Sequence, residues 1–215
     1  MTLAADLYFS FRSPYSYLAI GRYRELAESR DVAITLRPVY PLAVRQPDFF
    51  ERSHPNWLRY TMLDMFRVAQ FHDIPFGPPR PDPIVQDIVT RQIATDQPRI
   101  RCITRLGQAA ANQGKGLAFA HEAAKLIWGG AVGWNEGDHL AGAAERSGLD
   151  LAELDAEVLD RADELDAEID QNQSALEAAG HWGVPTLVLE GEPFFGQDRI
   201  AMAIWRMEQK GLAQK

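Results

Sequence analysis

The residues with the clearest capacity for chemistry stand near the start of the chain, in the segment Ser13-Pro14-Tyr15-Ser16. A serine followed by proline is typical of a helix start, because the hydroxyl can cap the helix and proline suits its first turn. Unpaired backbone N–H groups and the positive end of the helix dipole favour an anion there, and the Ser13 hydroxyl can donate a hydrogen bond to it. No histidine or carboxylate close in the sequence would ionise Ser13, so we interpret it as a hydrogen-bond donor, with helix capping alone as the alternative.

Two later segments are suited to holding a ligand. Proline is disfavoured inside a sheet, so Val184-Pro185 before the β-prone stretch 186–189 predicts a cis-proline loop, with an ordinary loop proline as the alternative. The backbone of Val184 could pair there with an extended peptide. Gln197 and Asp198 precede a final helical pattern, and we expect Asp198 to cap that helix.

Hydrophobic periodicity and turn residues predict the elements that must position these side chains. Residues 4–10 and 32–39 are predicted to be strands and the stretch between them a helix, which gives a strand-helix-strand unit with a parallel pair. A hairpin and a last helix close the chain. Between these parts the sequence is mostly helical, with helices expected at 57–71 and near 84–94, 99–113, 117–128, 136–147 and 151–179, and a proline-rich loop at 75–83.

This order of elements predicts an α/β fold class, a thioredoxin-like fold with a large all-helical insertion. We expect a discontinuous thioredoxin-like domain formed by residues 1–43 and 180–215. Residues 44–179 would then form a helical insertion domain.

Three motifs in sequence order carry a resemblance to a known family. In the thioredoxin superfamily the first helix begins at a Cys-x-x-Cys motif, a cis-proline loop faces it, and the last helix begins nearby. Here the corresponding segments are 13–16, 183–186 and 195–199, and the insertion adds Tyr60, Asp64, Arg67 and Ile74-Pro75-Phe76. Over nearly its whole length the chain resembles the kappa-class glutathione transferases and the 2-hydroxychromene-2-carboxylate isomerases, relatives of the DsbA-like disulfide oxidoreductases.

The resemblance implies glutathione as the cofactor. Ser13 would stabilise the thiolate of glutathione, whose thiol resembles free cysteine with a pKa of about 8.5. Val184 and Pro185 would bind the tripeptide backbone, while Gln197 and Asp198 would take its γ-glutamyl end. The lead hypothesis is a glutathione-dependent isomerase that acts on an aromatic enone-type acid by reversible thiolate addition. The alternatives are a kappa-like transferase that consumes glutathione and a non-catalytic peptide-binding protein of the same fold.

The family also implies a substrate pocket between the thiol and the helical insertion. The candidate lining residues are Arg12, Tyr15, Trp57, Arg67, Trp128, Trp134 and Trp182. Apart from Arg12, residues of these types more often belong to the core or to an interface. Arg12 could attract an acidic substrate or face solvent. The isomerases of the family carry a Lys and an Asn after the second strand, whereas this chain has the stretch 42–47 there, so the carbon skeleton of the substrate stays open.

Composition and charge exclude several classes of function. The 22 basic and 30 acidic residues give a net charge of -8 without a basic run, so we expect no nucleic acid partner. No segment approaches the roughly 20 apolar residues of a membrane span and no signal peptide is evident, so we expect a cytoplasmic protein. Cys102 is the only cysteine, which rules out an internal disulfide, and the scattered histidines predict no metal site. By resemblance, a homodimer and a small aromatic or electrophilic substrate are expected.

Overall fold

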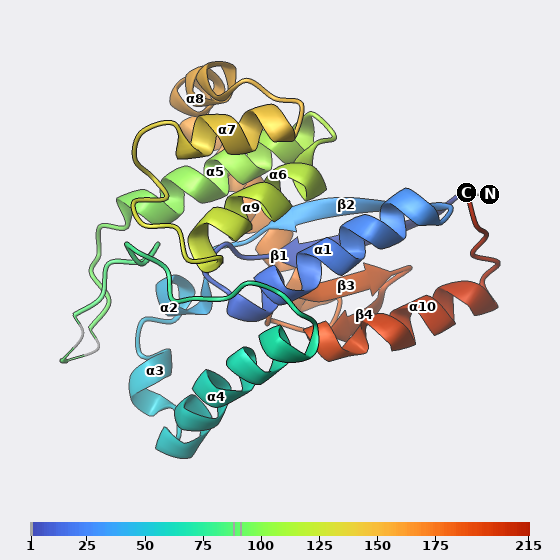
Figure 1. Ribbon diagram of the computed structural model, residues 1–215, viewed down its shortest axis with the longest axis horizontal. Helices are drawn as coiled ribbons and strands as arrows, with labels where there is room; N and C mark the ends of the chain where they lie inside the picture. Colours follow the sequence, from blue (N-terminus) through green and yellow to red (C-terminus); the bar gives the residue numbers. More distant parts are fainter. Residues whose placement is uncertain (1, 88, 91) are drawn as a thin grey trace.

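The computed structural model describes residues 2–87, 89–90 and 92–215. Figure 1 shows a central sheet surrounded by helices, with the two chain termini next to each other. The elements, in chain order, are β1 (Leu3–Phe9), α1 (Pro14–Ser29), β2 (Val32–Pro38), α2 (Leu42–Arg45), α3 (Phe49–Arg52), α4 (Pro55–Phe71), α5 (Pro98–Asn112), α6 (Gly116–Trp128), α7 (His139–Arg146), α8 (Leu151–Asp160), α9 (Ala162–Ala178), β3 (Thr186–Leu189), β4 (Glu192–Phe195), the 3-10 helix η1 (Gln197–Arg199) and α10 (Ile200–Gln209).

The segment that carries Ser13 follows β1, and the loop that carries Val184 and Pro185 precedes β3, so one sheet positions both. Its described strands form one sheet of four in the order β2-β1-β3-β4. β1 and β2 are parallel, whereas β3 pairs antiparallel with both β1 and β4. A parallel pair needs a crossover connection and α1 supplies it, so the predicted strand-helix-strand unit is confirmed. The hairpin and the thioredoxin-like fold with a helical insertion are confirmed as well.

The hydrophobic core joins the strand-helix-strand unit to the insertion. Leu7 of β1 and Leu18 of α1 belong to the same buried cluster as Ile103 of α5 and Phe119 of α6. The two parts are therefore packed as one body, and the limits expected for the two domains stay a prediction. Within the described ranges, no helix combines the length and the apolar composition needed to cross a membrane.

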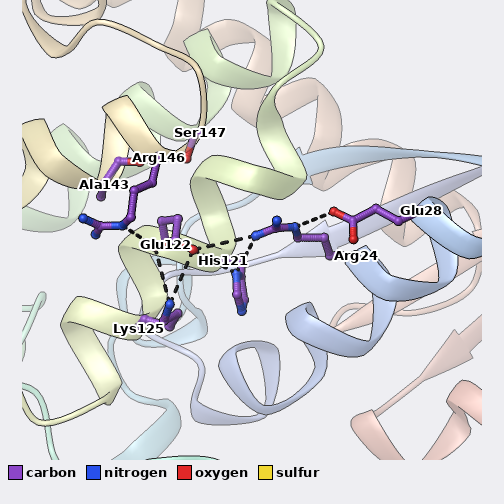
Figure 2. Close-up of polar contacts among 8 residues, drawn as sticks. All are labelled: Arg24, Glu28, His121, Glu122, Lys125, Ala143, Arg146 and Ser147. Atoms are coloured by element: carbon purple, nitrogen blue, oxygen red, sulfur yellow. Dashed lines mark hydrogen bonds and ion pairs between the residues drawn. The ribbon is translucent and has the colours of Figure 1, made fainter.

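A cluster of charged side chains also ties the insertion to α1 (Figure 2). Glu122 of α6 has a side chain that is 7% exposed, and its carboxylate is surrounded by three cations of α1, α6 and α7 and by the His121 imidazole, whose pKa is lowered by burial. The shortest N···O distances to this carboxylate are 3.7, 3.3, 3.5 and 2.7 Å for Arg24, His121, Lys125 and Arg146. We name these residues together the Glu122 cluster. Because its pairs join three helices, the cluster holds α6 and α7 against α1.

The helix predicted near 84–94 is wrong. The described residues of this stretch form turns and an isolated β-bridge, and residues 88 and 91 lie outside the described residues. Gln97 supports this irregular backbone, because its side chain accepts a hydrogen bond from the Val85 N–H at 2.8 Å and donates one to the Val85 carbonyl at 2.9 Å. A side chain 12 residues away thus replaces the bonds that a helix would supply.

The remaining helical predictions need adjusted bounds. The helix expected at 136–147 begins at His139. The helix expected at 151–179 is interrupted at Arg161, where φ is -117° and ψ is 27°, so that α8 and α9 are separate. The helices α2 and α3 were not predicted, because four residues are too few to show a helical period.

Candidate active site

Ser13 occupies the N-cap of α1 and faces the loop before β3. Its Oγ accepts a hydrogen bond from the Ser16 N–H at 3.2 Å and donates one to the Val184 carbonyl at 3.3 Å. The second bond is long, since hydroxyl donors usually lie about 2.7–2.8 Å from an acceptor oxygen. Pro14 has no N–H, and the Tyr15 N–H has no acceptor within the described part of the chain. The start of α1 therefore offers a free backbone donor beside a weakly engaged hydroxyl.

The loop opposite Ser13 presents its backbone to the same place. The Val184–Pro185 peptide bond is cis, which confirms the predicted cis-proline loop. Thr186 Oγ1 donates to the Gly183 carbonyl at 2.7 Å, and the Gly196 N–H donates to the Pro185 carbonyl at 2.8 Å, so the loop is fixed on both sides. Among the described residues the Val184 N–H has no acceptor. This backbone can therefore pair with an extended peptide.

Tyr15 connects the start of α1 to α4. Its hydroxyl donates a hydrogen bond to Asp64 Oδ2 at 2.7 Å. Burial raises the pKa of Tyr15, and the hydrogen bond to Asp64 and the nearby Asp198 charge raise it further. The phenol stays protonated and keeps α4 against the helix that carries Ser13.

Gln197 and Asp198 lie in η1, directly after a sharp change of direction at Gly196. The φ of Gly196 is +104°, a conformation that glycine adopts without steric cost. The prediction that Asp198 caps the last helix is wrong, because α10 begins at Ile200 with Arg199 at its N-cap. The intervening 3-10 turn moves the helix start beyond Asp198. The Asp198 carboxylate instead pairs with Arg199 at 2.6 Å.

A cavity of about 480 Å³ lies where α1, α4 and η1 meet. We name it the arginine cavity after its described lining residues: Arg22, Arg67, Val68, Phe71, His72, Gln197 and Asp198. Arg22 donates through Nη2 to the Gln197 side-chain oxygen at 2.7 Å, which links α1 to η1. The structure thus brings three predicted residues, Arg67, Gln197 and Asp198, to one cavity. It adds Arg22, which sequence reasoning missed.

Arg12 lies beside Ser13, but its charge is already engaged. Its Nε and Nη2 donate to the two carboxylate oxygens of Asp82 at 2.6 and 2.9 Å. The guanidinium also lies over the Trp128 ring, 5.5 Å from its centroid. A bidentate pair of this kind is among the stronger hydrogen-bonded contacts. Arg12 therefore holds the proline-rich loop to the start of α1, and it would attract an acidic substrate only if this pair opened.

Two of the predicted aromatic residues, Trp57 and Trp182, contact the same ring, that of Phe49. Trp57 of α4 and Trp182 each make an edge contact with Phe49, with ring centroids 5.5 and 6.2 Å apart. Both tryptophans are about half exposed, whereas Trp128 and Trp134 are buried and belong to the core. Phe49 was not predicted, because a phenylalanine in a four-residue helix carries no sequence signal of its own.

Ionisable side chains give the arginine cavity a positive character. Burial lowers the pKa of the Arg22 guanidinium, whose ordinary value is far above neutrality, so it keeps its charge. Burial and the Arg22 charge both lower the pKa of His72, which is therefore neutral at physiological pH. In the described ranges no group of three or more His, Cys, Asp or Glu side chains could hold a metal ion.

Comparisons with known proteins agree with this architecture. A family model described as a DSBA-like thioredoxin domain matches residues 4–204. The 2-hydroxychromene-2-carboxylate isomerase of Sphingobium xenophagum is 26% identical over 204 residues, covering 93% of this chain and 95% of the relative. The protein of that name from Pseudomonas sp. (strain C18) is 27% identical over 207 residues, covering 94% and 89%. A solved structure of 2-hydroxychromene-2-carboxylate isomerase has a similar fold, with a TM-score of 0.69 and 23% identity over 96% of this chain and 95% of that chain.

Proposed function

We propose that this chain, which belongs to the DSBA-like thioredoxin domain family, is a glutathione-dependent isomerase acting on an aromatic enone-type acid. The relatives named 2-hydroxychromene-2-carboxylate isomerase support this class of reaction. The first turn of α1 lacks the cysteines that disulfide exchange requires, and the single Cys102 lies on α5. An external thiol would therefore have to supply the sulfur.

The position of Ser13 carries the proposal. Its hydroxyl, the free Tyr15 N–H and the Val184 backbone converge at one helix start. A hydroxyl and an amide donor would stabilise a thiolate there and lower the pKa of the bound thiol, as would the helix dipole. These donors fit a sulfur atom at the place where related folds have a cysteine.

Glutathione would supply a thiolate that adds reversibly to a conjugated double bond, which lets that bond rotate before the thiolate leaves unchanged. Val184 would hold the peptide backbone, as an edge strand does. Gln197 and Asp198 would hold the γ-glutamyl end, with the amide N–H groups of η1 facing its carboxylate. These contacts would fix the thiol against the second substrate and so contribute through positioning.

Aromatic side chains offer a place for the second substrate. Phe49 contacts both Trp57 and Trp182, which directly precedes the cis-proline loop, and the two tryptophans are about half exposed. A flat aromatic acid could stack on such a surface. The orientation of the substrate toward the thiol would then depend on the stacking geometry.

Replacing Ser13 tests the proposal directly. Ser13→Ala should lower kcat for isomerisation of 2-hydroxychromene-2-carboxylate by about 10²–10³-fold, the effect of losing one donor to an anion in a preorganised site. The Kd for glutathione should change little, because the backbone contacts remain. The pKa of the bound thiol, followed through the ultraviolet absorbance of the thiolate, should rise.

Ser16 provides a matched control on the same helical turn. It is fully buried, and its hydroxyl makes no hydrogen bond within the described part of the chain. Ser16→Ala should therefore leave kcat and the thiol pKa unchanged. An unchanged rate in Ser13→Ala would reduce Ser13 to a helix cap. Stoichiometric loss of glutathione during turnover would instead identify a transferase.

A further inference from the structure

Arg22 and Arg67 line the arginine cavity, and no described carboxylate forms an ion pair with either of them. In the described ranges, neither guanidinium forms an ion pair with a carboxylate, whereas the side chains of Arg12, Arg24 and Arg105 all do. Arg22 uses its Nη2 for two neutral oxygens, the Leu18 carbonyl and the Gln197 side chain. Two cations thus face one cavity of a chain with a net charge of -8.

Burial makes this arrangement costly in the absence of an anion. The Arg22 side chain is partly buried, and its Nε is inaccessible and without a hydrogen-bond partner among the described residues. Burial lowers its pKa more than the nearby Tyr23 and Asp198 raise it, which reflects the free-energy cost of keeping the charge there. A negatively charged ligand group would offset that cost, since a charge-assisted hydrogen bond is about twice as strong as a neutral one.

The other lining residues favour a carboxylate attached to an organic molecule. Asp198 is the acidic residue of the lining, and its charge is already paired with Arg199 at 2.6 Å. Val68 and Phe71 add an apolar wall from α4. Two guanidinium groups beside an apolar wall match the planar, bidentate geometry of a carboxylate with a hydrocarbon stem.

We propose that the arginine cavity is a carboxylate-binding subsite in which Arg22 and Arg67 hold an acid group of a ligand. The inference rests on the proposed function, which offers two sources of the carboxylate: the γ-glutamyl end of glutathione and the acid group of the second substrate. Both would enter from the side of η1, where Gln197 links the cavity to the proposed glutathione site.

Two ligands and one exposed arginine test the subsite. Arg67 is exposed on α4, so Arg67→Ala should fold normally, and the exposed Arg59 on the same helix provides the control variant Arg59→Ala. Calorimetric titrations would compare glutathione with 4-aminobutanoyl-Cys-Gly, which lacks the γ-glutamyl α-carboxylate. If that carboxylate occupies the cavity, Arg67→Ala weakens glutathione by about tenfold and leaves the analogue unchanged. If the second substrate occupies it, Kd for glutathione stays constant and KM for the acid rises by about tenfold.

Arg67→Lys keeps the positive charge but removes the planar guanidinium group. It should recover part of the affinity that Arg67→Ala loses. Unchanged Kd and KM in Arg67→Ala, with a wild-type protein that binds glutathione, would overturn the subsite and leave the proposed function standing. A wild-type protein that binds no glutathione would overturn the proposed function. In that case sodium glutamate is the probe, with sodium chloride as the control. Glutamate should raise the Tm of the wild type but not the Tm of Arg67→Ala. Equal shifts in the two proteins would overturn the subsite.

Discussion

Two charged regions that both involve α1 differ in how their cations are balanced, although Arg24 and Arg22, which contribute to them, are two residues apart. In the Glu122 cluster, Arg24 faces a nearly buried carboxylate (Figure 2). In the arginine cavity, Arg22 contacts an amide and a carbonyl oxygen, and no carboxylate of the described residues pairs with it. Both regions remove cations from water, but in the first a carboxylate pairs with the cations, whereas Asp198, the acidic residue of the second, pairs with Arg199 instead. Breaking the first should therefore destabilise the fold, while the second, as the proposed subsite, would keep its interaction energy for a ligand.

The largest effect on stability is expected when the Glu122 carboxylate is removed. Glu122→Ala should lower the free energy of unfolding by about 2–3 kcal/mol, because it leaves partly buried cations without an anion. The value lies below that of a fully buried pair, since Lys125 and Arg146 are about half exposed. Urea unfolding measures it. Glu28→Ala is the control, because Glu28 pairs with Arg24 from a side chain that is 62% exposed and should cost less than about 0.5 kcal/mol. Equal losses of stability in Glu122→Ala and Glu28→Ala would show that the Glu122 cluster stabilises the fold no more than an exposed ion pair does.

Acid should weaken the Glu122 cluster to a smaller extent. Burial by itself would raise the pKa of Glu122, but the hydrogen bond from Arg146 and the charges of Lys125 and His121 hold that pKa below its ordinary value. The unfolded carboxyl titrates near about 4.3, so the contribution is complete above that pH and is lost as the pH falls through the lower folded pKa. In urea unfolding, the stability difference between wild type and Glu122→Gln should shrink below about pH 4. A difference independent of pH would contradict this.

The smallest effect on stability is expected at the arginine cavity. Arg22→Met should change the free energy of unfolding by less than about 0.5 kcal/mol, because the lost hydrogen bonds to Leu18 and Gln197 are offset by removal of a half-buried, unpaired cation. Arg24→Met should cost about 1 kcal/mol more than this, since it removes a cation from the Glu122 cluster. Both values come from urea unfolding. If Arg22→Met were the more destabilising of the two, Arg22 would have a structural role.

Much of the fold followed from local sequence patterns. The unit from β1 to β2, the hairpin and most helices have periodic apolar residues and clear turn residues, so their existence and order were predictable. The stretch 84–94 was not, because Gln97 fixes its backbone through bonds that no periodicity reveals. The break at Arg161 was equally hidden, since charged residues continue through it without a glycine or proline.

The candidate site was predictable where its residues have local signatures. Ser13 before proline and Val184 before a cis-proline are recognisable from adjacent residues alone. Arg22 has no such signature, because an arginine on a helix is usually solvated, and its partner Gln197 is 175 residues away. Long-range pairs of this kind depend on tertiary packing, which the sequence does not display.

The Val184 carbonyl could exchange one hydrogen-bond donor for another when a peptide binds. In the structure it accepts the Ser13 hydroxyl at 3.3 Å. A peptide that pairs with Val184 as an added strand brings its own N–H to this carbonyl. In the proposed complex, the arriving amide therefore displaces the serine proton, which becomes free to turn toward the sulfur. Recognition of the peptide backbone and activation of the hydroxyl would then occur in one event, with no net loss of hydrogen bonds.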